Sequence, residues 1–424
     1  MNYFLSTLPN GVRVVTVPMQ ERDSASVAIW VQTGGRFESK KESGISHVLE
    51  HMLFKGTKRR TTRQIKEEIE GVGGVLNAFT SEEVTCYFAK LLKEHYPRAL
   101  DVLSDMVNHA TLDGGELMKE KTVILEEIKM YRDLPAHHVH ELLGELLWRG
   151  HPLGRPIAGT VESVAAMTRK QVVEYKKRYY QPKNILVSVS GPVQHYEVLD
   201  LVKRHFPQTG YGRASKFQTF RGKQSVPRAH FMEKDTEQTH FALGLHGYSK
   251  SHPDRYSLGL LNIILGANMS SRLFEQVREK RGLAYEIRSS LSFYQDTGAV
   301  TISAGVETKK TAMTLAVILK ELEKLKRKPV TDGELRRAKD YFMSQLYLAL
   351  EDTLDHVLWV GERALEKQEL PDPHKIRQRI EAVSRESILQ TARKLFVTSN
   401  LNFSLIGPVH QTVQARIRRD LKIG

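Results

Sequence analysis

The sequence is poor in cysteine and has no long apolar segment. Cys86 is its only cysteine, so the chain can form no internal disulfide and no metal site built from several thiolates. No apolar run approaches the roughly 18 residues that a membrane-spanning helix needs. The first residues, MNYFLSTLPNGVRVV, lack the basic stretch and apolar run that define a secretory signal. These absences predict a cytoplasmic protein with no membrane partner.

Acidic residues are outnumbered by basic ones, 49 against 63, which gives a formal net charge of +14. A surplus of this size raises the hypothesis of a nucleic-acid or anionic-membrane partner. The basic residues are scattered, however, and their densest groups contain no interleaved aromatic residues and no recognisable binding motif. The sequence therefore favours a solvated basic surface and no nucleic-acid partner. The groups are KGTKRRTTR (55–63), LKRK (325–328) and RIRRDLK (416–422).

At 424 residues the chain is too long for one ordinary hydrophobic core, which predicts two domains. Two pairs of similar segments also occur along it. Glu116 and Glu334 match in the first pair, 218 positions apart, and Gly191 and Gly407 match in the second, 216 positions apart. Because two independent pairs share nearly one offset, the chain is predicted to contain the same fold twice. The pairs are LDGGELMKEKTVIL (112–125) with VTDGELRRAKDYFM (330–343), and ILVSVSGPV (185–193) with LNFSLIGPV (401–409).

In each half, strand-like alternation comes before long amphipathic helices, one of which is expected at 115–148. This order is typical of the α+β class, so each half is expected to be an antiparallel or mixed sheet covered by helices. Over 206–227, Gly, Ser, Pro and Lys replace the periodic apolar residues. The expected domains are 1–210 and 228–424, joined by a linker at 211–227.

Residues 47–51 read HVLEH. On a helix, His47, Glu50 and His51 would project from one face, because they lie three and four positions apart. Two neutral imidazoles at this spacing can bind one zinc ion, and the glutamate can take a proton from the zinc-bound water, whose pKa the metal lowers to about 7. This is the inverted H-x-x-E-H arrangement of metalloproteases. With 17 histidines in the chain, a chance match is the alternative.

A zinc enzyme usually needs a third protein ligand, and MKEKTVILEEIKMY (118–131) offers candidates. Glu120 and Glu127 lie two helical turns apart and would face one way, whereas Glu126 would be turned by about 100°. We expect Glu127 to bind zinc, and Glu120 to hold a ligand or the base in place from behind. The alternative is a set of acidic residues on a solvated helix.

Several motifs, spread over nearly the whole chain, resemble the pitrilysin/insulinase family of zinc peptidases. The resemblance is strongest to its two-domain branch, which includes bacterial processing proteases and the mitochondrial processing peptidase beta subunit. The motifs are NGVRVV, GISHVLEHMLFKGT, GGVLNAFTSEEVTCYFAKL, VILEEIKMYRD, HPLGRPIAGT and MSSRLFEQVREKRGLAYEI.

The resemblance implies one zinc ion per chain, with His47, His51 and Glu127 as its ligands. It further implies that Glu50 is the general base and Glu120 a supporting catalytic residue. The N-terminal domain would then be the zinc-binding, catalytic one.

In the second half, RLFEQVREKRGLAY matches the family's arginine and tyrosine that hold the substrate backbone and the oxyanion. These are Arg278 and Tyr285, which would share a helix face if the helix continued that far. A guanidinium and a phenol are suited to stabilising negative charge that develops in peptide hydrolysis. Without the resemblance, an ordinary surface arginine and a packed tyrosine would be the simpler interpretation.

The segment NAFTSEEVT resembles the family's edge strand, to which an extended substrate adds as a further strand. Asn77, Ala78, Phe79 and Thr80 are therefore expected to bind substrate, although Phe79 also suits a core position. Pairing through the backbone favours unfolded peptides over particular sequences.

The resemblance also bears on assembly. In family members with four domains, the zinc and the Arg/Tyr pair lie in different parts of a closed, clamshell-like chamber, of which a two-domain chain supplies half. This chain carries both features, so a homodimer is expected. A heterodimer with an inactive homologue is the alternative.

One of two substrate-recognition positions departs from the family pattern. Processing-peptidase beta subunits have acidic residues ten and fourteen positions after the glutamate ligand, where this chain has His137 and Glu141. The departure weakens strict selection of arginine and leaves Glu141 as the expected substrate contact. His137, His138 and His140 suggest a second metal site, although exposed histidines at a helix start are favoured.

The sequence thus predicts a zinc-dependent endopeptidase that cuts short unfolded peptides, such as leader, targeting or regulatory peptides. The alternative is a noncatalytic peptide-binding or scaffold subunit. The intact metal triad, and Ala267 and Asn268 where noncatalytic alpha subunits have flexible glycines, favour the catalytic interpretation.

Overall fold

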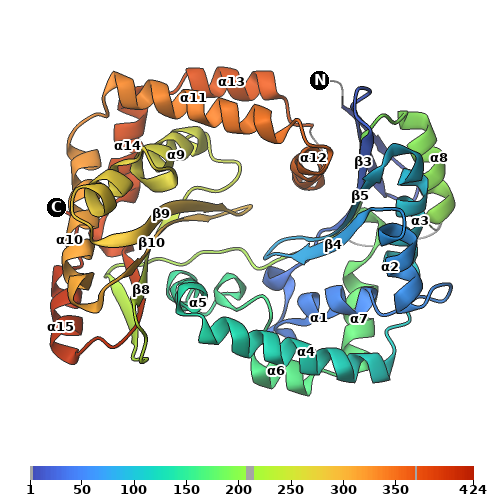
Figure 1. The fold of residues 1–424 in the computed structure, drawn as a ribbon, viewed down its shortest axis with the longest axis horizontal. Coiled ribbons are helices and arrows are strands. Elements are labelled where there is room, and N and C mark those ends of the chain that lie inside the picture. Colours follow the sequence, from blue (N-terminus) through green and yellow to red (C-terminus); the bar gives the residue numbers. More distant parts are fainter. Residues whose placement is uncertain (1–2, 207–213, 368–369) are drawn as a thin grey trace. The chain divides into compact units, whose positions relative to one another are not determined.

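The computed structural model describes residues 3–206, 214–367 and 370–424 (Figure 1). The chain divides into two compact units, each assembled from three segments. The predicted boundaries at 210 and 228 remain a prediction, and residues 211–213 of the predicted linker lie outside the described residues. The first unit consists of Met1–Ile128, Arg155–Gln218 and Leu346–Asp372, and the second of Lys129–Gly154, Thr219–Gln345 and Pro373–Gly424.

The first unit contains a mixed sheet of six strands in the order β1-β2-β6-β3-β5-β4. Its neighbouring strands are antiparallel except for β2 and β6, which are parallel. Because β4 pairs only with β5, it forms an edge of the sheet. The strands are β1 (Phe4–Thr7), β2 (Arg13–Pro18), β3 (Ser24–Val31), β4 (Val75–Thr80), β5 (Thr85–Leu92) and β6 (Ile185–Gly191).

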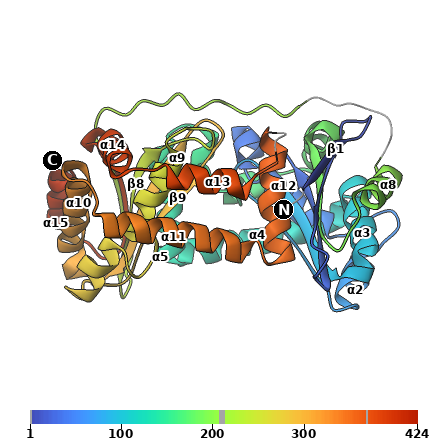
Figure 2. The same ribbon diagram turned by 90° about the horizontal axis from the view of Figure 1, so that it is seen from above.

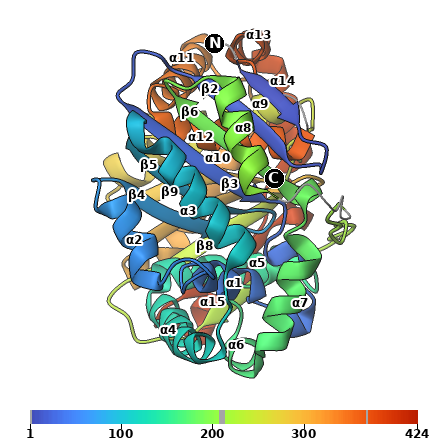
Figure 3. The same ribbon diagram turned by 90° about the vertical axis from the view of Figure 1, so that its right-hand side faces the viewer.

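Both faces of the first sheet are covered by helices, which explains why β3 is apolar almost throughout. Val27, Ile29 and Val31 face a core shared with α3 (Tyr96–His109) and α8 (His195–His205), the helices across the near face in Figure 3. Ala28 and Trp30 alternate with them and face α12 (Thr353–Lys367). The central strand is therefore buried from both sides.

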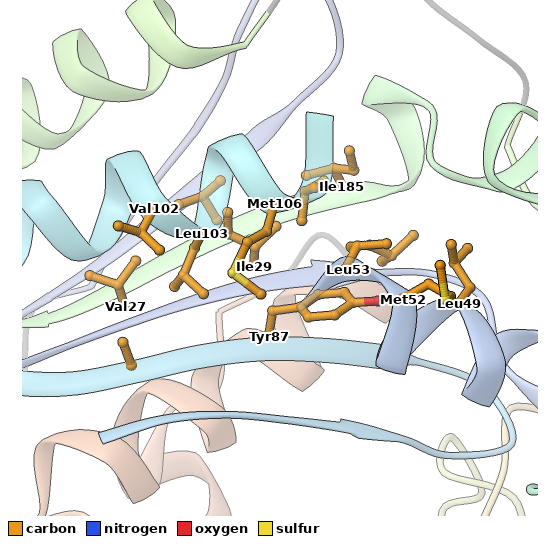
Figure 4. Close-up of a cluster of buried hydrophobic side chains, with 14 of the residues drawn as sticks. Val27, Ile29, Leu49, Met52, Leu53, Tyr87, Val102, Leu103, Met106 and Ile185 are labelled. Atoms are coloured by element: carbon orange, nitrogen blue, oxygen red, sulfur yellow. The ribbon is translucent and has the colours of Figure 1, made fainter. Parts of the chain in front are cut away.

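Helix α1 (Ile45–Leu53), which carries HVLEH, packs into the first of these cores. Leu49, Met52 and Leu53 are at most 1% exposed and lie beside Tyr87 of β5 (Figure 4). The apolar residues therefore fix one face of α1 against the sheet. His47, Glu50 and His51 keep larger exposed fractions on the opposite face.

The second unit repeats the topology of the first. Its sheet has the order β7-β11-β8-β10-β9, in which only β7 and β11 are parallel. Strand for strand this is the order β2-β6-β3-β5-β4, so the duplication predicted from the sequence is present in the fold. The strands are β7 (Arg228–Met232), β8 (Thr239–Gly247), β9 (Ala284–Phe293), β10 (Gly298–Val306) and β11 (Asn402–Ile406).

Helices cover both faces of the second sheet as well. Helices α10 (Thr311–Arg327), α14 (Arg385–Leu395) and α15 (Gln411–Asp420) gather to the left of β8 in Figure 2, and α9 (Arg255–Asn262) packs on α14. Helix α5 (Pro135–Leu147) packs on the other side of β8, where Leu143 and Leu147 contact the strand at Gly244. The remaining helices are α2 (Thr62–Glu70), α4 (Gly114–Asp133), α6 (Val161–Ala166), α7 (Arg169–Tyr179), α11 (Asp332–Ala349) and α13 (Pro373–Glu381). Within the described ranges, no helix combines the length and apolarity of a membrane span.

Each half of the sequence contributes one helix to the unit that contains the other half's sheet. Helix α5 comes from the first half of the sequence but covers the second sheet, and α12 comes from the second half but covers the first. Arg13 on β2 fixes the end of α12, since its Nη1 donates to the carbonyls of Ala364 (2.9 Å) and Leu365 (2.8 Å).

The prediction of a single helix at 115–148 is wrong. Helix α4 ends at Asp133 and α5 begins at Pro135, with Leu134 extended at φ −96° and ψ 98°. A proline disfavours the helical conformation of the residue before it and cannot donate a backbone hydrogen bond. The break separates α4, most of which belongs to the first unit, from α5, which belongs to the second.

Replacing Gly361 with alanine is expected to destabilise the protein by about 1–3 kcal/mol. A Cβ atom there would lie 2.2 Å from Trp30 Nε1, which donates to Ser188 Oγ (3.0 Å). The free energy of unfolding in urea measures the effect. Gly144→Ala on α5 is the control, because nothing lies within 4 Å of its Cβ and a helical alanine should stabilise. Equal changes in the two variants would contradict close packing at Gly361.

Candidate metal centre

The N-terminus of α1 is held by a close backbone contact with HPLGRPIAGT. Gly44, which precedes the helix, has a φ of 89°, a conformation that glycine adopts without strain. A Cβ on Gly44 would lie 2.6 Å from the carbonyl oxygen of Ala158, and one on Gly159 would lie 2.6 Å from that of Ser43. Two of the motifs that carry the family resemblance therefore pack against each other.

Glu38 accepts hydrogen bonds from two N–H groups at the start of α1. The N–H of Gly44 donates to Glu38 Oε2 (2.7 Å), and that of Ser46 donates to Oε1 (2.9 Å). The side chain is fully buried, and this burial raises the pKa of Glu38 to about 7, although the two N–H groups favour the carboxylate. Glu38 thus fixes the helix that presents the histidines.

The contribution of Glu38 to stability is expected to fall by about 2.5 kcal/mol between pH 5 and pH 8. Its folded pKa, about 7, lies above the ordinary value of 4.5, so between these values the folded state binds the proton more tightly. The stabilisation is complete below pH 4.5 and is lost as the pH rises through 7. The measurement is the difference in unfolding free energy between wild type and Glu38→Gln at both pH values, in which unrelated groups cancel. If the unfolding free energy of wild type minus that of Glu38→Gln increased with pH, the prediction would be wrong.

His47, His51 and Glu127 converge at one point. Glu127 Oε2 lies 3.8 Å from His47 Nε2 and 3.8 Å from His51 Nε2. All three ligand atoms lie within 4.8 Å of one another. Within the described ranges, this is the one group of three or more acidic, histidine or cysteine side chains that could hold a metal ion.

The donor set fits a zinc ion. Four ligands at about 2.1 Å from zinc would be separated from one another by about 3.4 Å, slightly less than the distances found here. Burial, and then His51, lower the pKa of His47 to about 4, so this imidazole is neutral at pH 7. Two neutral imidazoles and one carboxylate are the protein ligands of many catalytic zinc sites.

Glu120 lies behind His51. Its Oε2 is 3.1 Å from His51 Nδ1, and its Oε1 is 2.6 Å from Lys55 Nζ. The contact to Nδ1 leaves His51 Nε2 facing Glu127. Reasoning from the sequence placed Glu120 behind the ligands but did not identify Lys55, which only the fold brings to this carboxylate.

Glu50 lies on the same helix, between the two histidines in sequence. Thr80 Oγ1 of β4 donates a hydrogen bond to Glu50 Oε2. Burial raises the pKa of Glu50, and the neighbouring Glu127 adds to this, while Thr80 and His51 oppose it. A carboxylate with a raised pKa is a better proton acceptor, which suits a general base.

The edge strand β4 carries the four residues expected to bind substrate. Phe79 is 36% exposed and packs edge-on against Trp30, with ring centroids 5.8 Å apart. Asn77 Oδ1 accepts from the N–H of Ala78 (2.8 Å). Thr80 points to Glu50 instead, so its side chain is already engaged. Their contact with substrate remains a prediction.

Arg278 and Tyr285 lie together in the second unit, but the expectation of a shared helix face is wrong. Arg278 lies on a π-helical segment, Phe274–Glu279, which ends before Tyr285 on β9. The Cζ atom of Arg278 is 4.7 Å from the Tyr285 ring centroid and 4.7 Å from that of Phe274. With 78% of its surface exposed, Tyr285 offers a phenol to an external group.

The second unit also carries Glu141 and the neighbouring histidines. Glu141 lies on α5, where burial raises its pKa. Burial likewise lowers the pKa of His138 and His140. In the part of the chain that the structure describes, these histidines form no further cluster of three potential ligands; His137 is exposed, and His138 and His140 are partly buried.

The basic group at 55–63 has acidic partners. Asp105, fully buried, accepts from Arg59 Nε (3.1 Å) and Arg60 Nη1 (2.9 Å). Arg60 also binds Asp101 and Glu68. Much of this local positive charge is therefore neutralised within the fold. The sequence had argued against a nucleic-acid partner only because this group contains no binding motif.

The second half lacks the carboxylates of the first. The offset of 218 between α4 and α11 places Ala338 and Gln345 where Glu120 and Glu127 stand. Neither replacement can supply a carboxylate. Fold and site together define a class of protein: a duplicated α+β chain that has, among its described residues, one His–His–Glu centre, which lies in the first half.

Comparison with known proteins gives this class its family. A family model described as Insulinase (Peptidase family M16) matches residues 13–161, and one described as Peptidase M16 inactive domain matches residues 166–342. The chain belongs to the insulinase family of peptidases. The mixed sheets and the two-domain organisation agree with the expectation drawn from the sequence.

The relatives are similar over almost their whole length. The chain is 39% identical to the uncharacterized zinc protease YmxG of Bacillus subtilis, covering 95% of this chain and 97% of the relative. It is 34% identical to a zinc protease of Streptomyces coelicolor, covering 97% and 91%. The crystal structure of a protease from Helicobacter pylori matches with a TM-score of 0.89 and 26% identity, covering 96% and 99%.

Proposed function

We propose that this protein is a zinc-dependent endopeptidase that cleaves short unfolded peptides. The observation that carries the proposal is the convergence of His47, His51 and Glu127, with Glu50 beside them on the same helix. The names of the relatives as zinc proteases support it. Leader, targeting and regulatory peptides are the proposed substrates, because pairing with the backbone of an edge strand requires an extended chain.

The residues divide the work as follows. His47, His51 and Glu127 would hold one zinc ion, which when bound supplies Lewis acidity and lowers the pKa of water. Glu50 takes the proton from the attacking water and returns it to the leaving amine. Thr80 orients the carboxylate of Glu50 through its hydrogen bond. Glu120 keeps His51 in the tautomer whose Nε2 binds metal.

Substrate binding is assigned to three further places. Asn77, Ala78 and Phe79 offer the unpaired edge of β4 to the peptide. Arg278 and Tyr285, from a second copy of the chain, stabilise the oxyanion in a homodimer. Glu141 favours a basic side chain near the cut.

A second candidate function is that of a noncatalytic peptide-binding or scaffold subunit. The match of residues 166–342 to a model described as an inactive domain favours it. That match, however, covers the half that lacks Glu127 and its partners, whereas the donor set lies in residues 13–161. The metal centre therefore favours the catalytic proposal.

The test is cleavage of a quenched fluorogenic peptide library by the purified protein. We expect cleavage that a chelator abolishes and that zinc restores. Light scattering on the same sample gives the molecular mass of the active species, which should be that of a homodimer. Zinc binding without cleavage, at any protein concentration, would favour the noncatalytic function.

A further inference from the structure

The structure contains a chain of contacts that leads away from the metal centre and ends at Lys55. Lys55 Nζ lies 2.6 Å from Glu120 Oε1, and Glu120 Oε2 lies 3.1 Å from His51 Nδ1. The side chain of Glu120 is 7% exposed and that of Lys55 is 24% exposed. The two oxygens of Glu120 therefore serve two different donors at a largely buried position.

A backbone hydrogen bond ties Lys55 to the end of α1. Lys55 follows the C-terminus of α1 by two residues, and its N–H donates to the carbonyl of Met52 (3.2 Å). Gly56 follows with a φ of 105°, a conformation that turns the chain away from the helix. The ammonium group thus approaches Glu120 from the C-terminal end of α1, the helix that carries His51.

We propose that Lys55 is a positioning residue of the metal centre, a role that rests on the proposed function. Its ammonium group holds Glu120 in the rotamer in which the other carboxylate oxygen accepts the Nδ1 proton of His51. That contact sets the tautomer and the ring orientation of His51, so its Nε2 lone pair points towards Glu127. Lys55 itself touches neither the metal nor the substrate.

Two effects of opposite sign make the role measurable. Loss of the ammonium group would leave Glu120 Oε1 without this donor and allow the carboxylate to rotate, which weakens metal binding. Loss of one positive charge near a divalent cation would, by electrostatics alone, strengthen metal binding. A positioning role therefore predicts weaker binding in the neutral variant, whereas a purely electrostatic role predicts tighter binding.

The experiment measures zinc affinity in the full-length protein by competition with a chromophoric chelator. Lys55→Met should raise the dissociation constant for zinc roughly 10–100-fold, the usual effect of removing a group that orients a ligand. Lys55→Arg, which keeps the charge and the donors, should retain most of the affinity. The matched control is Lys58→Met, an exposed lysine three positions along the same loop, whose affinity should equal that of wild type.

A second readout is the visible spectrum of the cobalt-substituted protein, which reports ligand geometry without activity. A changed spectrum is expected for Lys55→Met, and an unchanged one for Lys58→Met. Lys55→Gln replaces Lys55→Met if the latter does not fold. Affinity equal to or tighter than wild type in the neutral Lys55 variants would overturn the role of Lys55 alone. A wild type that bound no zinc would overturn the proposed function as well.

Discussion

Glu50→Gln is expected to lower kcat for peptide cleavage by roughly 10²–10⁴-fold while the protein keeps its zinc. The amide has nearly the shape of the carboxylate, so Thr80 Oγ1 can still donate to its oxygen. It cannot take a proton from the attacking water at neutral pH, and the reaction loses its base. Steady-state cleavage of a fluorogenic peptide and the zinc content of the same preparation measure the two properties.

The matched control for this variant is Glu70→Gln, an exposed glutamate at the end of α2. It removes one negative charge from the same unit at a surface position. Cleavage by this variant should equal that of wild type. A normal kcat in Glu50→Gln would show that Glu50 is not the general base.

Glu127→Gln is expected to raise the dissociation constant for zinc by more than about 100-fold, and so to abolish cleavage at ordinary zinc concentrations. A directly bound carboxylate should matter more than an orienting group, whose loss typically costs about 10–100-fold. The carboxylate lies 3.8 Å from both imidazole nitrogens and carries the only negative charge of the donor set. Chelator competition measures the dissociation constant directly.

Glu126→Gln is the control on the same helix. Its side chain is exposed and lies about 100° around the helix from Glu127. Its zinc affinity should not change. If both variants lost affinity equally, general negative charge along α4 would explain metal binding better than a ligand at Glu127.

The distribution of apolar residues along the sequence indicated strands well where they form short runs. Strands β2 and β5 coincide with the short, largely apolar runs RVVTVP and TCYFAKLL. The prediction failed at Pro135, where apolar periodicity continued across a break that the proline itself indicated. It failed again at Tyr285, because spacing alone could not distinguish a continued helix from the start of β9.

The site was predictable to the extent that its residues share an element. His47, Glu50 and His51 lie on α1, and their spacing alone predicted one face. The contact of Lys55 with Glu120 joins residues 65 positions apart in sequence, and the bonds from Glu38 to α1 depend on its burial. No local pattern predicts such contacts, because a lysine or glutamate that is buried in a contact looks the same in the sequence as one on the surface.

The exchange of α5 and α12 limits how the chain can be divided. A gene fragment that ends in the predicted linker, 211–227, would encode the first sheet without α12, leaving the apolar face around Trp30 in water. The complementary fragment would lack α5 and expose its own sheet around Gly244. We therefore expect neither fragment to fold alone, and a mixture of the two fragments to restore both sheets. The duplicated halves would then depend on each other for folding, although each contains a whole sheet.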